Sequence, residues 1–228
     1  MYLRNIIYGI WEEVESYGIT DDSPLTYPLI KDKVISVNNT IIKDTWRKKL
    51  PIDMCYSIDP SVEVTCFKDS VVVGGITFTS RRPMYKATLP AFVPEIDWDD
   101  ISYFGMQGLA GGMTRRTLYG YMASEGNVWT ADYPIYTIIG NEAIMKNLPT
   151  KGFTLATLVS IREDPTTIST WDSNDEQDFP TPSLLKLQML TKIEILKSLG
   201  RPDLITDAQR QLSQQPQRQE QVQQEAND

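Results

Sequence analysis

Histidine is absent from this chain of 228 residues, and cysteine is nearly so. Without histidine, Ser-His-Asp and Cys-His catalytic arrangements and histidine-dependent metal sites are excluded. The two cysteines, Cys55 and Cys66, lack the further ligands that a zinc site needs, so we expect free thiols in or beside a strand. The sequence therefore predicts neither a metal nor a cofactor.

Long apolar runs and an excess of positive charge are also missing. No stretch reaches the roughly 18 apolar residues that a membrane-spanning helix requires. Residues 1–18 resemble a signal peptide only over their first few positions, because glutamates interrupt the apolar stretch. The formal net charge is −8, and no segment has the basic footprint of a protein that grips nucleic acid. We expect synthesis in the cytoplasm, no membrane association and no tight DNA binding.

What is present first is helical periodicity. Apolar residues in 2–17 recur at three- and four-residue spacings, and a second helix is expected from about Thr26 to Trp46, with Pro28 in its first turn. The short connection between them favours an antiparallel pair. The expected apolar stripe of the second helix is Ile30, Val34, Val37, Ile41 and Trp46.

From residue 52 to about 162 the pattern changes to short segments rich in Val, Ile, Thr, Tyr and Phe, separated by Gly, Pro, Asn and Asp. This pattern predicts a β-rich region. The expected strand segments are 62–67, 71–80, 115–122, 127–130, 133–140 and 152–161.

Helical spacing returns after Phe179. Thr181 is expected to cap a helix whose first position is Pro182, and Gly200 and Pro202 are expected to end it. Its expected apolar positions are Leu185, Leu187, Leu190, Ile193, Leu196 and Leu199.

Three amphipathic helices bury their stripes most economically against one another. The sequence therefore predicts an α+β protein: a helical bundle of two N-terminal helices and one C-terminal helix, with an inserted β-rich domain and an extended C-terminal arm. The expected parts are an N-terminal helical hairpin (1–51), a β-rich insertion (52–176), a C-terminal bundle helix (177–202) and a Gln-rich arm (203–228).

One acidic cluster invites a catalytic or metal-binding interpretation. Glu95, Asp97, Asp99 and Asp100 lie within six residues and could form a divalent-cation site or an acid/base pair. Acidic residues beside an aromatic in a polar loop are more often a solvated turn or a helix start, and this second interpretation is favoured.

The glycine-rich stretch 105–116 does not match a phosphate-binding loop, because it lacks the G-K-[ST] ending. Arg115 and Arg116 are expected to begin a strand. Long glycine-rich loops often adapt to a partner or line a passage, so we expect Gly108, Gly111 and Gly112 to face a channel or a neighbouring protein.

Aromatic residues between 98 and 171 suggest either a sugar-binding face or ordinary packing. Without polar groups arranged beside them, packing in a core or subunit interface is favoured.

The last 22 residues contain nine glutamines and few apolar side chains. Such a segment cannot bury enough surface to offset the entropy of ordering itself, so on its own it should be disordered. It is either a solvated, dispensable terminus or an arm that a partner orders.

The wording of several segments resembles a virion structural protein of crAss-like bacteriophages, a head-to-tail connector ring protein. The segments that carry the resemblance are TWRKK (45–49), IDWDDISYFG (96–105), LYGYMASEGNVWT (118–130), YTIIGNEAIMKNLPTKG (136–152), REDPTTISTW (162–171), DFPTPSLLKLQMLTK (178–192) and RPDLITDAQRQL (201–212).

This resemblance implies a multi-copy ring below the portal, expected to be twelvefold, through which DNA passes without specific binding. It implies portal protein and other ring or tail proteins as partners, and a C-terminal arm that embraces the portal. The expected partner-binding residues in the arm are Asp207, Gln209, Arg210, Gln211, Leu212 and Pro216. The alternatives are a virion hydrolase that uses the 95–100 carboxylates on glycans and a glycan-binding module that uses exposed aromatics.

Overall fold

The computed structural model describes residues 1–17, 25–80, 82–94, 96, 100–124, 133–148, 152–201, 204–206 and 209. Helices and strands are both present, and the expected α+β class is confirmed. The chain divides into two compact units: residues 1–55 together with 172–228, and residues 56–171.

The first unit contains three long helices: α1 (Leu3–Glu15), α2 (Tyr27–Arg47) and α4 (Leu184–Ser198), with a short 3₁₀ turn, η1 (Asp53–Cys55). The side chain of Thr26 accepts a hydrogen bond from the Leu29 amide and so caps α2 at the expected place. The buried positions of α1 follow the predicted spacing: Leu3, Ile6, Ile7, Ile10 and Val14.

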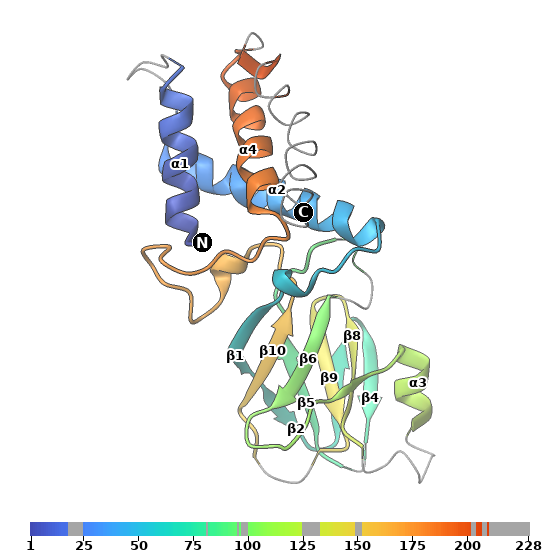
Figure 1. Ribbon diagram of the computed structural model, residues 1–228. Coiled ribbons are helices and arrows are strands. Elements are labelled where there is room, and N and C mark those ends of the chain that lie inside the picture. The colour runs from blue at the N-terminus through green and yellow to red at the C-terminus, as the bar shows by residue number, and fades with distance from the viewer. Residues whose placement is uncertain are drawn as a thin grey trace, which may run out of the picture. The chain divides into compact units, whose positions relative to one another are not determined.

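All three helices contact one another. Figure 1 shows α1 and α4 side by side, running in the same direction, with α2 crossing both. The path of α2 therefore differs from the antiparallel hairpin expected for residues 1–51.

The segment before α4 is fastened to the start of α1 and to α2. The buried Asp175 carboxylate accepts hydrogen bonds from Tyr27 and from Lys31, whose Nζ lies 2.8 Å from Oδ1. The Asp175 carbonyl accepts from the Arg4 amide at 3.1 Å. Residues far apart in the sequence thus share one buried charge, which fixes the entry into α4.

The expected start of α4 at Thr181 and Pro182 is wrong by two residues. Ser183 occupies the N-cap, and its hydroxyl accepts from the Lys186 amide at 3.4 Å. Within α4 the expected Leu185 is exposed, whereas Thr191 and Lys192 are buried. Lys192 reaches over the ring of Tyr17 and pairs with Glu13, so its burial rests on partners in α1 and just after it.

The second unit holds the strands. A three-stranded sheet has the order β1-β10-β6, a five-stranded sheet has the order β2-β5-β9-β8-β7, and β3 and β4 form a separate hairpin. The strands are β1 (Ser57–Glu63), β2 (Thr65–Phe67), β3 (Ser70–Val73), β4 (Ile76–Thr79), β5 (Met84–Thr88), β6 (Ile101–Met106), β7 (Thr114–Arg115), β8 (Ile135–Ile139), β9 (Glu142–Lys146) and β10 (Leu155–Ser160). A 3₁₀ turn, η4 (Pro165–Thr167), follows β10.

The two sheets are joined through one stretch of backbone. β1 pairs with β10, and only Val64 separates it from β2, which pairs with β5. Side chains from both sheets, including Val62, Tyr85, Phe104, Tyr136 and Leu158, form a single buried cluster. Residues 57–67 therefore act as a shared strand that brings both sheets around one core.

The strand expected over 115–122 is wrong for most of its length. After β7 the chain forms a short helix, α3 (Leu118–Ala123), capped by the Thr117 hydroxyl, which accepts from the Gly120 amide. β-Propensity of the tyrosines suggested a strand, but the cap and the burial of Tyr121 against Phe78 favour a helical turn. The expected strand 127–130 lies outside the described residues.

Candidate functional site

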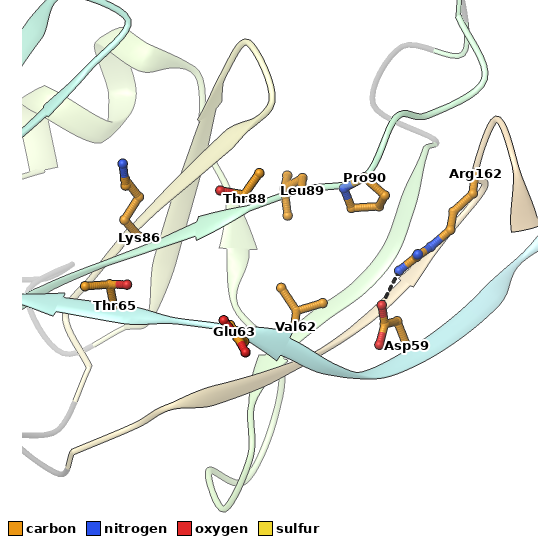
Figure 2. A pocket seen from close by; sticks show the side chains of 9 residues that line it. All are labelled: Asp59, Val62, Glu63, Thr65, Lys86, Thr88, Leu89, Pro90 and Arg162. Atoms are coloured by element: carbon orange, nitrogen blue, oxygen red, sulfur yellow. Dashed lines mark hydrogen bonds and ion pairs between the residues drawn. The ribbon is translucent and has the colours of Figure 1, made fainter. Parts of the chain in front are cut away.

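A pocket of about 430 Å³ opens in the wall of the β-unit between the shared strand and β5. We call it the β1/β5 pocket, and Figure 2 shows its lining side chains. The lining residues are Asp59, Val62, Glu63, Thr65, Lys86, Thr88, Leu89, Pro90 and Arg162. Its volume lies within the range of roughly 300–1,000 Å³ that is typical of ligand pockets.

The pocket exists because two strands separate. β2 pairs with β5 up to Thr65 opposite Lys86, but β1 turns away to pair with β10, with Glu63 opposite Leu155. The far end of the gap closes again where Phe92 pairs with Arg162. A gap therefore interrupts a wall that is otherwise joined by backbone hydrogen bonds (Figure 2).

At the wide end of the gap lies a buried ion pair. Arg162 Nη2 is 2.5 Å from Asp59 Oδ2, and the two side chains are 3% and 11% exposed. The other Asp59 oxygen accepts from the Ser61 amide and the Ser169 hydroxyl. Burial alone would raise the pKa of Asp59, but the hydrogen bonds from Ser61 and Arg162 outweigh it, so the pKa lies below its ordinary value.

Arg162 is not fully satisfied by this pairing. Its buried Nε has no hydrogen-bond acceptor among the residues that the structure describes. A buried donor without an acceptor costs about 1–3 kcal/mol, so such groups usually meet a water or a ligand.

Besides the apolar Val62, Leu89 and Pro90, the other lining groups are polar and carry charges of both signs. Lys86 Nζ lies 2.7 Å from the Glu142 carboxylate, with both side chains about a quarter exposed, and Glu63 is exposed at the rim. Thr65 and Thr88 add two hydroxyls. The arrangement is suited to binding a polar group. It is poorly suited to acid catalysis, because Asp59 is held ionised by its partners and is therefore a poor proton donor near neutral pH.

The glycine-rich loop closes on itself at its base. The Met113 amide donates to the Phe104 carbonyl at 2.7 Å, and the ring of Tyr103 lies against the loop. A Cβ on Gly112 would come within 2.9 Å of that ring, so Gly112 is needed for close packing. Gly108 and Gly111 have φ values of +82° and +90° and face open space, because a Cβ on either would meet nothing within 4 Å. Arg115 is the last residue of β7 and Arg116 lies outside it, so the expectation that these two arginines begin a strand is wrong.

Of the four residues of the acidic cluster, the structure describes Asp100. Its Oδ1 accepts from Arg115 Nη1 at 2.6 Å, with both side chains largely buried. Burial raises the pKa of Asp100, and Arg115 offsets this only in part. Glu95, Asp97 and Asp99 lie outside the described residues. Within the described residues, no cluster of acidic or cysteine side chains is arranged to hold a metal ion.

Several aromatic residues of the same region are core residues. Phe104 and Tyr136 pack edge to face at 5.1 Å, and Tyr85 packs in the same way against Phe153. Tyr119 and Tyr133 are 83% and 69% exposed, and they are the aromatic residues of this region that face solvent most fully in the described structure.

The expected partner-binding residues of the arm are largely beyond what the structure describes. Gln209 is described and exposed. Asp207, Arg210, Gln211, Leu212 and Pro216 lie outside the described residues, so the structure brings none of them to a site.

Sequence reasoning missed the β1/β5 pocket entirely. Its central pair joins residues 103 positions apart, and nothing in local spacing indicates that β1 and β10 are neighbours. One signal was present: Pro60 within a strand segment is typical of a bulge or an edge, and the register of β1 shifts between Asp59 and Val62.

Among the described residues, no helix has the length and apolar content needed to traverse a bilayer. Neither a protein-family model nor a curated protein sequence matches the chain.

Proposed function

We propose that the protein is a structural component of a phage virion, a ring-forming head-to-tail connector that joins the portal to the downstream tail and lines the DNA exit channel. In this proposal the three long helices form the bundle that packs beside neighbouring copies. The β-unit is the inserted domain that extends toward the next tail component, and residues 203–228 form the arm that docks on the portal or a neighbouring ring.

The observation that carries the proposal is the order of the elements. The helical unit is built from residues 1–55 and 172–228, and the β-unit occupies the residues between them. The resemblance to the connector family implies the same order: helices, an inserted β-rich part, a returning helix and an arm.

Charge supports the same proposal. The net charge of −8 gives the protein no general attraction for phosphate, which suits a channel through which DNA must move without stalling. The buried cations Arg162 and Lys192 and the partly buried Lys31 each pair with a carboxylate of the same unit, so their charges stabilise the fold. The open Gly108 and Gly111 turn is a candidate contact with the channel or the next ring.

A glycan hydrolase is less well supported. The described member of the acidic cluster, Asp100, is held by Arg115, which leaves it poorly placed as a free acid or base. Alanine at Asp97, Asp99 and Asp100 separates the two functions: a folded connector still assembles, whereas a hydrolase loses turnover.

Mass photometry tests the proposal directly. The purified protein is mixed with the portal, and we expect portal particles to gain mass in near-stoichiometric steps, up to about twelve copies if closed rings match the portal. Heterologous contacts that close into a ring should make loading saturable. Observing only free monomer, with the portal and with downstream tail proteins alike, would contradict the proposal.

A further inference from the structure

We propose that the β1/β5 pocket is the docking site for the glutamine-rich segment, residues 209–224, of a second copy of this chain. The inference rests on the multi-copy part of the proposed function. It adds an inter-subunit contact that the connector resemblance does not supply.

The charges of the pocket favour a neutral, amide-bearing ligand. Its lining carries two cations, Lys86 and Arg162, and two anions, Asp59 and Glu63. A ligand with a net charge of either sign would meet a like charge on one wall. A primary amide has an oxygen that accepts from a cation and an NH₂ group that donates to a carboxylate, so it can satisfy both kinds of wall.

One group in the pocket wall lacks such a partner. Arg162 is almost fully buried, and its Nε has no acceptor among the described residues. Because this Nε is itself shielded, the Arg162 side chain must turn toward the gap for an amide oxygen to supply the acceptor, and hydrogen bonds to charged groups are worth about 1.5–3 kcal/mol. The hydroxyls of Thr65 and Thr88 can hold a second amide further along the gap.

The backbone around the pocket suits an extended ligand. Pairing between the shared strand and β5 ends at Thr65 opposite Lys86. The backbone at Glu63 and at Thr88 therefore borders the gap from opposite sides without pairing across it. An extended peptide laid along such edges can form main-chain hydrogen bonds while its side chains enter the pocket.

The chain itself contains a segment with the required chemistry. Residues 209–224 include nine glutamines, and they begin at an exposed described residue, Gln209. An extended peptide advances about 3.3 Å per residue, so this segment can reach roughly 50 Å. That length is enough to cross from one small domain to a neighbouring subunit.

Photo-crosslinking between unlabelled and ¹⁵N-labelled copies of the full chain tests the proposal. A benzophenone amino acid replaces Pro216 in unlabelled protein, which is mixed with ¹⁵N-labelled protein that lacks the crosslinker. We expect crosslinked peptides that join unlabelled residue 216 to labelled peptides covering 59–65, 86–90 or 162. Crosslinks confined to unlabelled partners, or to peptides away from the pocket, would overturn the proposal.

Variants separate docking from general proximity. Thr88→Arg places a long cation in the pocket and should reduce the pocket crosslinks about tenfold, the equivalent of one lost hydrogen bond. Thr114→Arg, at another exposed strand threonine, is the matched control and should leave them unchanged. Replacing Gln214, Gln215 and Gln217 with Glu in the crosslinker-bearing copy should also reduce them, because Asp59 and Glu63 repel added carboxylates. Circular dichroism and the melting temperature verify that each variant is folded.

The outcomes also distinguish this inference from the connector proposal. Portal loading without pocket crosslinks refutes the docking and leaves the connector function standing. Pocket crosslinks in a protein that never loads on the portal support the docking and refute the connector.

Discussion

At the scale of single residues, the structure depends on a few buried charges that have partners far along the chain. Asp59 and Arg162 are the most deeply buried of these pairs in the described β-unit, and Lys86 with Glu142 forms a more exposed pair nearby. Removing one partner of a buried pair leaves an uncompensated charge, which costs far more than breaking a pair at the surface.

Asp59→Leu is therefore expected to destabilise the protein by roughly 3–5 kcal/mol. The double variant Asp59→Leu/Arg162→Met should recover most of that loss, because an apolar pair can replace a buried ion pair. Glu142→Gln should cost less than about 1 kcal/mol, since its pair is partly exposed. Urea unfolding measures all three, and a double variant as unstable as the single one would contradict the assignment.

The pH dependence of this pair has a definite sign. The folded-state pKa of Asp59 is lowered, so its stabilisation is fully present above the unfolded-state pKa of about 3.9. It is lost as pH falls through the lower folded-state pKa. The stability difference between the wild type and Asp59→Leu should therefore shrink below about pH 4 in the same unfolding measurements.

At the scale of elements, capping side chains determine where a helix begins and ends. The spacing of apolar residues alone predicts these ends only to within a few residues. The Ser183 hydroxyl accepts from an amide of α4, whereas the buried Thr181 hydroxyl has no hydrogen-bond partner among the described residues. The two hydroxyls lie two residues apart and have opposite energetic roles.

Ser183→Ala is expected to destabilise the protein by about 1 kcal/mol through loss of the cap. Thr181→Ala is the matched control and should be neutral or slightly stabilising, because it removes a buried hydroxyl that lacks a partner. Thermal unfolding followed by circular dichroism compares them. A larger loss for Thr181→Ala than for Ser183→Ala would place the cap at the residue that the sequence first suggested.

At the scale of the whole molecule, the proposed connector function gives the glutamine-rich end of the chain a partner to bind. Deleting residues 207–228 should lower the affinity for the portal or for a neighbouring ring at least about tenfold, as expected when a docking contact is lost. A Gly/Ser segment of equal length is the control for chain length. Mass photometry titration gives the affinities, and unchanged values with every partner would mark the segment as a dispensable terminus.

Much of the fold can be predicted from the sequence, because the spacing of apolar residues indicates which side chains are buried. Leu3, Ile6 and Ile10 follow helical spacing, and α1 forms there. The alternation in 155–160 likewise agrees with the strand β10. The sequence predicts a strand over 115–122 because tyrosine favours strands, yet Thr117 caps the helix α3 at Leu118–Ala123.

The candidate site was beyond prediction for a different reason. Arg162 and Lys192 are buried, but a charged residue is buried only when the fold supplies its partner, and those partners are Asp59 and Glu13. Which strands become neighbours is decided by the whole core, because each strand must bury its apolar face against the others. The pocket follows from the separation of β1 from β5, which no local pattern encodes.

The shared strand over residues 57–67 has one further consequence. Since it contributes one ladder to the three-stranded sheet and another to the five-stranded sheet, neither sheet can open along it without disturbing the other. The two sheets should therefore melt as a single cooperative unit, with matched amide-exchange protection on β10 and β5. A mechanical load applied to this stretch would therefore be divided between two sets of hydrogen bonds.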